Sequence, residues 1–184
     1  MIESEIVNTV IGEMHNCFLN DTDYFSSTRD VFTARLQSFI LRSKKYLEAA
    51  VIGEVGNNTF DHNFIFGEQY PRGVYCNLSY KDKYIIIADY GRGVKGSLSL
   101  VIPSITTDME AVKIAFTRQI SGRSPEQRGN GLKFVSETIQ QNNWCLFFQS
   151  GNGTCSIDKK GLLFTESSTF LQGCLAIINF NGGN

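Results

Sequence analysis

The amino-acid sequence predicts an α+β sandwich, in which a mixed, mostly antiparallel sheet is covered on one face by helices. Two observations lead to this fold class. Apolar residues recur with the helical period over roughly the first sixty residues, and the chain beyond them is mainly strand-like, with one helical segment interleaved. Helices followed by strands, rather than a regular alternation of the two, are typical of α+β domains.

The predicted helices share apolar residues spaced three or four apart. They are expected over residues 6–14, 31–40 and 44–61, after the capping-box pattern at 107–110, and from about residue 132. The predicted strands are short runs of apolar and β-branched residues. They are expected at 74–80, 84–88, 144–149, 154–157, 161–164 and 174–180. Between them, residues 91–131 form a glycine-rich and largely irregular segment.

Composition restricts the class of protein. The 184 residues predict one domain, 1–184, with N-terminal helices in 1–43. A net charge of −1 argues against a nucleic-acid partner, and no apolar run approaches the ~20 residues that cross a membrane. The acidic N-terminus does not resemble a signal peptide, and the five cysteines are odd in number and contain no CxxC pair. We therefore expect reduced thiols and a cytoplasmic location.

The helix expected at 44–61 carries polar residues on a face that is otherwise apolar. Glu54, Asn58 and His62 are spaced by four and share one side, while Gly53 and Gly56 lie on the opposite side. The pattern predicts an enclosed helix that sends a carboxylate and an amide inward, where they need partners. A hydrated metal and phosphate oxygens would satisfy both groups; local backbone groups near the helix end are the alternative.

Two glycine motifs follow. Asp89-x-Gly91-x-Gly93 ends a buried strand, and an acid beside glycines suits close recognition of a base amino group. Gly129-x-Gly131 precedes a helix, whose N-terminus favours anions. Each motif alone is equally typical of an ordinary turn or helix cap.

In this order, Glu54-x3-Asn58, Asp89-x-Gly91-x-Gly93 and Gly129-x-Gly131-Leu132 resemble the N, G1 and G2 boxes of the GHKL superfamily (gyrase, Hsp90, histidine kinases and MutL). Asn58-x3-His62 is similar to the N box of stand-alone prokaryotic anti-sigma-factor kinases and histidine kinase-like ATPases. The resemblance covers roughly residues 30–180. It implies a two-layer Bergerat-type sandwich with a mobile ATP lid at 94–128.

The resemblance also implies site residues. Asn58 would coordinate Mg²⁺ on the phosphates of ATP, Glu54 would activate water, and Asp89 would bind the adenine amino group. The backbone at Gly91 and Gly93 would approach the base and ribose.

The remaining implied residues surround the phosphates and the base. Gly129, Asn130 and Gly131, followed by Leu132, would wrap the phosphates. Arg128 flanks this motif, and its charge would either neutralise the γ-phosphate or stay in solvent. His62 would orient Asn58 or touch a phosphate, or simply end its helix. The last core strand of the family usually begins Gly-Thr; here Cys174 replaces the threonine next to the adenine, and a thiol is a weaker hydrogen-bond partner.

Two functions fit these residues. The first is Mg²⁺-dependent ATP binding with hydrolysis, or with phosphotransfer to an unidentified partner protein, as in serine kinases of the anti-sigma type. The alternative is a regulatory module in which ATP orders a docking surface and turnover is small. Both would allow a homodimer, and neither needs a membrane.

Overall fold

The structure is a computed structural model that describes residues 2, 4–15, 23–62, 73–81, 83–118 and 131–181. Its elements follow one another along the chain in this order: α1 (Ser4–His15), β1 (Phe25–Ser26), α2 (Arg29–Ser43), α3 (Tyr46–His62), β2 (Val74–Tyr80), β3 (Tyr84–Asp89), α4 (Gly93–Leu98), α5 (Asp108–Thr117), α6 (Gly131–Gln141), β4 (Cys145–Asp158) and β5 (Gly161–Asn179).

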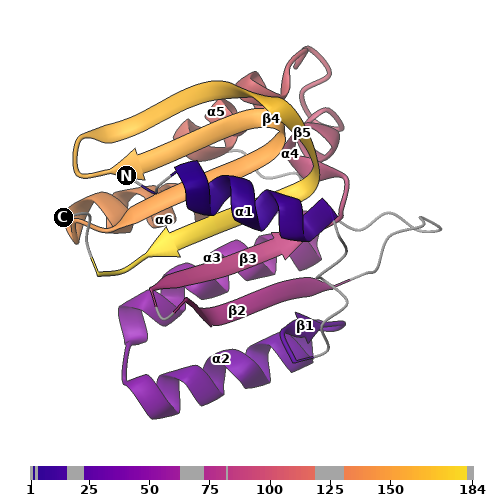
Figure 1. Ribbon diagram of the computed structural model, residues 1–184. Coiled ribbons are helices and arrows are strands. Elements are labelled where there is room, and N and C mark those ends of the chain that lie inside the picture. The colour runs from indigo at the N-terminus through magenta and orange to yellow at the C-terminus, as the bar shows by residue number, and fades with distance from the viewer. Residues whose placement is uncertain are drawn as a thin grey trace.

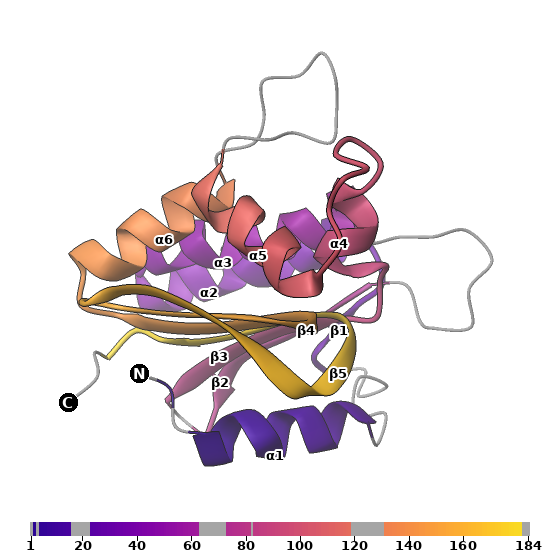
Figure 2. The same ribbon diagram turned by 90° about the horizontal axis from the view of Figure 1, so that it is seen from above.

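The described strands form one sheet in the order β1-β2-β3-β5-β4, and neighbouring strands are antiparallel. Helices α2 to α6 lie together on one face of this sheet (Figures 1 and 2). The main core fills the space between them, from Val51 and Ile52 of α3 to Ile87, Leu146 and Ala176 of the strands. The predicted α+β sandwich is confirmed.

Helix α1 packs against the other face of the sheet, where it is the only helix drawn in Figure 2. Its apolar stripe, which includes Ile6 and Val10, forms a second core with Ile86, Leu175 and Ile177. These strand residues alternate with those of the main core. A strand that is apolar on both faces needs cover on both, and this cover was not foreseen in the prediction of one helical face.

The C-terminal strands differ from the prediction. Four short strands were expected, whereas β4 and β5 form one long hairpin whose strands curve strongly near their middle (Figure 1). The register shifts between Ser150 and Gly153, and Gly151 has a positive φ of 60°. Bulges keep a strand paired while bending it. The glycines of the bend and the Ser/Thr-rich stretch after residue 164 therefore gave the sequence pattern of loops.

The segment predicted as irregular contains more structure than expected. Besides α5, whose Thr107 cap accepts a hydrogen bond from the Glu110 amide at 3.1 Å as foreseen, it includes the short helix α4. Val112 and Phe116 of α5 are buried in the main core. This part of the predicted lid 94–128 is therefore firmly packed, and residues 119–130 lie outside the described part. The lid stays a prediction.

Helix α3 is enclosed on one side by α2. A Cβ added at Gly56 would lie 2.2 Å from Cζ of Phe32, a ring that is buried in the main core. At Gly53 the nearest described atom would be Cδ2 of Leu36, at 3.3 Å. The glycines thus serve close helix packing, and this packing fixes the orientation of α3 on the sheet.

The cysteines within the described residues are buried free thiols: Cys76, Cys145, Cys155 and Cys174. Burial raises the pKa of Cys155 from 9.0 to about 12. It also raises the pKa of Cys76 to about 12, outweighing the positive charge of Arg35, which lowers it. Protonated buried thiols behave as small apolar side chains. Cys17 lies outside the described part.

A search for membrane-spanning helices in the described part of the chain found none with the required length and hydrophobicity.

We expect Gly56→Ala to lower the free energy of unfolding by about 1–3 kcal/mol, because its methyl group would overlap the buried Phe32 ring. Gly53→Ala is the matched control. It adds the same methyl group to the same helix beside a flexible leucine, and the gain of about 1 kcal/mol in helix propensity opposes any crowding. Urea denaturation measures both variants. Equal losses would contradict the packing described here.

Candidate functional site

The polar face of α3 opens toward solvent rather than into the core. Val51, Ile52 and Val55 are buried against the sheet, whereas Glu54 is exposed and Asn58 is half-buried. The expectation that both polar groups point into an enclosed space is therefore wrong for Glu54. The sheet and α2 cover two sides of α3 and leave Glu54 on a third, so no burial cost requires a ligand for this carboxylate.

The first residue of α6 meets this polar face. A Cβ added at Gly131 would lie 2.5 Å from Oε2 of Glu54 and 3.7 Å from Nδ2 of Asn58. Only a glycine therefore fits without displacing the Glu54 side chain. The structure thus brings together three of the predicted site residues from two helices.

Asp89 is the last residue of β3, and its side chain is hydrogen-bonded to α3. Oδ2 of Asp89 accepts a hydrogen bond from the Thr59 hydroxyl at 3.0 Å, and both side chains are nearly fully buried, with 2% and 3% exposure. Thr59 is the neighbour of Asn58 on α3. Residues 54–59 therefore contact both Gly131 and Asp89, which belong to separate sequence motifs.

The loop after Asp89 is held by side chains from three strands. The Gly91 amide donates to Oδ1 of Asp89 at 2.7 Å, and Nε2 of Gln172 donates to the Gly91 carbonyl at 2.6 Å. The Val94 amide donates to the Ser150 hydroxyl at 2.9 Å. Gly93 has a φ of +72°, a conformation that favours glycine.

Cys174 of β5 lies between Asp89 on β3 and Ser150 on β4 in the sheet. It pairs with Asp89 on β3 and with Ser150 on β4, so the three side chains share the helical face of the sheet. Gly173 has a φ of +83°, and a Cβ there would lie 2.0 Å from the Asp89 carbonyl oxygen. The predicted last core strand, with its Gly-Cys pair, therefore runs directly beside Asp89.

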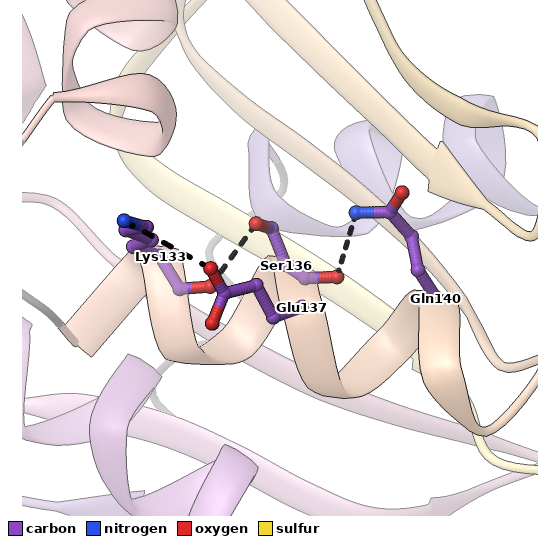
Figure 3. A network of polar contacts seen from close by, with 4 residues as sticks. All are labelled: Lys133, Ser136, Glu137 and Gln140. Atoms are coloured by element: carbon purple, nitrogen blue, oxygen red, sulfur yellow. Dashed lines mark hydrogen bonds and ion pairs between the residues drawn. The ribbon is translucent and has the colours of Figure 1, made fainter.

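Helix α6 has Lys133 and Glu137 on its exposed side, whereas Ser136 is buried (Figure 3). Lys133 is exposed, and its ammonium group lies 3.9 Å from Oε1 of Glu137. The Ser136 hydroxyl donates to the Lys133 carbonyl and Gln140 to the Ser136 carbonyl, both at 3.1 Å. The side chain of Leu132 packs against the main core instead. A contact between Leu132 and a ligand is thus left to its backbone and stays a prediction.

Several predicted site residues are not placed. Arg128, Gly129 and Asn130 lie outside the described residues, and so does the side chain of His62, the last residue of α3. Their roles around the phosphates stay predictions.

Three residues of the site were missed in the sequence: Thr59, Ser150 and Gln172. Thr59 follows Asn58 directly, and a hydroxyl on a helix that is expected to be buried needs a hydrogen-bond partner. Its position in the sequence was therefore a signal that could have identified it. Ser150 and Gln172 gave none, because their relation to the Gly91 loop depends on the pairing of β4 with β5 and of β5 with β3.

The fold is similar to a solved structure of the 43K ATPase domain of Thermus thermophilus gyrase B in complex with an aminocoumarin. The two share 13% sequence identity, with a TM-score of 0.40. The similarity covers 78% of this chain and 38% of the gyrase chain, so less than two thirds of that protein is represented. No protein-family model and no curated protein matches the sequence. A function for this chain therefore depends on the geometry of its own site.

We expect Thr59→Val to lower the free energy of unfolding by about 1–3 kcal/mol, because it keeps the side-chain shape and removes the hydroxyl donor from a buried carboxylate. Thr59→Ser keeps that donor and removes only a methyl group. Its cost should therefore be smaller, about 1 kcal/mol. Chemical denaturation compares the two variants. A serine variant as unstable as the valine variant would show that the hydrogen bond to Asp89 contributes little.

Proposed function

We propose that this chain binds ATP with Mg²⁺ in the manner of the GHKL superfamily and hydrolyses it, or transfers its γ-phosphoryl group to a partner protein. One observation carries the proposal. Two turns of α3 contact both Asp89 and Gly131, through Thr59 and Glu54. Residues from three motifs that are far apart in the sequence therefore lie next to one another, and this proximity supports a shared site.

Asp89 provides recognition of the base in this proposal. An ionised carboxylate is purely an acceptor of hydrogen bonds, and burial strengthens its hydrogen bond to an amino group. Adenine presents such a donor, whereas guanine presents a carbonyl oxygen at the corresponding position. We therefore infer a preference for ATP over GTP.

The residues around Gly131 suit a magnesium-bound triphosphate. The Asn58 side chain is half-buried next to the first residue of α6, and its carboxamide oxygen is the kind of hard ligand that Mg²⁺ accepts along with water and phosphate oxygens. The N-terminal end of α6 supplies backbone amides for an anion. When bound, the metal would neutralise charge on the phosphates.

Glu54 is the general base in the hydrolytic version. Its Oε2 atom is directed at Gly131 on α6, the end at which the phosphates would lie, and a carboxylate there can accept a proton from an attacking water.

The second candidate function is a nucleotide-gated binding module with little turnover. The exposure of Glu54 favours it, because a hydrolytic site usually encloses its general base and excludes bulk water. ATP and Mg²⁺ would then order a surface for an unidentified partner protein.

Isothermal calorimetry tests binding. We expect Mg-ATP to bind the wild-type protein with a Kd between about 1 μM and 1 mM, and Asp89→Asn to weaken it by about tenfold to a hundredfold through the loss of a charged acceptor. Asp158→Asn is the matched control: this aspartate also ends a strand, β4, and its Oδ1 accepts a hydrogen bond of 2.8 Å from the Lys160 amide, two residues on. Absence of heat with Mg-ATP, or equal losses in both variants, would contradict the proposal.

Release of inorganic phosphate separates the two candidate functions. We expect Glu54→Gln to retain Mg-ATP binding and to lose about a hundredfold or more of the turnover, the contribution usual for a general base. A wild-type protein that binds ATP but releases no more phosphate than the variant would favour the binding module.

A further inference from the structure

We propose that Ser150 and Gln172 are positioning residues that hold the loop Gly91–Val94 in its nucleotide-receiving shape before any nucleotide arrives. This inference rests on the proposed function, since it assigns these two residues to the adenine side of that site. Neither residue belongs to the motifs that define the site in the sequence.

Gly91 is fixed through both of its peptide groups. Its amide donates to Asp89, from the end of β3, and its carbonyl accepts a hydrogen bond of 2.6 Å from Gln172 on β5. A glycine has more backbone freedom than any other residue. Two hydrogen bonds, to Asp89 on β3 and from Gln172 on β5, remove this freedom. The two peptide groups of Gly91 are therefore held in one orientation.

Ser150 fixes the other end of the loop. Its hydroxyl accepts from the Val94 amide and donates to the Gly173 carbonyl, both at 2.9 Å, and it is 3% exposed. A serine hydroxyl in this arrangement uses its single proton on β5 and a lone pair on the loop. It therefore links α4 to β5 and is not directed at a ligand.

The backbone around these bonds leaves no space for a different arrangement. A Cβ at Gly93 would lie 2.7 Å from the Ser150 hydroxyl, and a Cβ at Gly173 would lie 2.0 Å from the Asp89 carbonyl oxygen. Both glycines have positive φ values. The loop, β3 and β5 thus approach more closely than any side chain would permit, and the hydrogen bonds of Ser150 and Gln172 set that approach.

A loop held in this way contributes to affinity by preorganisation. Ordering a glycine-rich loop on binding costs free energy that is subtracted from the affinity of the ligand. When Asp89 and the loop are already placed, the adenine meets a formed surface. Loss of the hydrogen bonds from Ser150 or Gln172 should therefore lower the affinity for every ligand that contains adenosine by the same factor, whatever the number of its phosphates.

Three variants test this proposal. Gln172→Met keeps the length of a half-buried side chain and removes its donor, and Ser150→Ala removes the hydroxyl. Asn152→Ala is the matched control, because Asn152 lies in the same hairpin and its side chain makes a similar bond to the Ser167 carbonyl at 2.8 Å. The side chain and the amide of Asn152 hydrogen-bond with Ser167 and Asp108 rather than with the loop. Should Ser150→Ala fail to fold, Gln172→Met tests the proposal by itself.

The first measurement is hydrogen exchange of the peptide that covers residues 90–96 in protein without nucleotide. We expect exchange about tenfold faster in Gln172→Met and Ser150→Ala than in the wild type or Asn152→Ala. Unchanged exchange in both test variants would overturn the proposal. This readout does not depend on ATP, so it is distinct from a failure of the proposed function, which would appear as a wild-type protein that binds no adenine nucleotide.

The second measurement is calorimetry with adenosine, Mg-ADP and Mg-ATP. Loss of one hydrogen bond corresponds to a Kd about threefold to tenfold higher. We expect this factor to be equal for the three ligands in each test variant, with wild-type Kd values for Asn152→Ala. A loss restricted to Mg-ATP, or an equal loss in Asn152→Ala, would show that the two residues do not position the adenine side.

Discussion

The hydrogen bond from Thr59 to Asp89 is the contact on which the geometry of the site depends. It is the described link between the polar end of the sheet and the helix that carries Glu54 and Asn58. Because both partners are buried, the bond forms in surroundings where an unpaired carboxylate would be costly. The bond joins Thr59 to the end of β3, and in the same orientation of α3 Glu54 and Asn58 lie beside the first residue of α6.

Glycines, which have no side chain, allow the helices and strands around the site to approach one another closely. Gly131 allows α6 to approach Glu54, Gly173 allows β5 to approach Asp89, and Gly56 allows α3 to lie against the ring of Phe32. Each glycine costs backbone entropy in the folded state. In return, the elements are held in place, because strands and helices that are packed at this distance cannot shift without displacing backbone atoms. The Asp89 end of the proposed nucleotide site is therefore rigid.

Much of the fold followed from the sequence because periodicity and capping are local properties. The stripes that gave α1, α2 and α3, and the Thr107 cap of α5, depend on neighbours within a few residues. The joining of four predicted strands into β4 and β5 did not follow, since the bend at Gly151 is stabilised by pairing with a distant segment. Likewise, the exposure of Glu54 depends on which sides of α3 are covered, and Ser150 and Gln172 became visible only through strand order.

Cys174 is the position at which this chain departs from the pattern of the GHKL superfamily that it resembles. The resemblance implies a threonine here, whose hydroxyl would lie next to the adenine and its aspartate. In this chain Asp89 already accepts hydrogen bonds from Thr59 and from the Gly91 amide. On the neighbouring strand, the Ser150 hydroxyl faces the same side of the sheet as Cys174 and connects β5 to the loop. Support for the carboxylate and for the loop thus comes from α3 and β4, so a nearly buried thiol at position 174 is compatible with the base recognition proposed for Asp89.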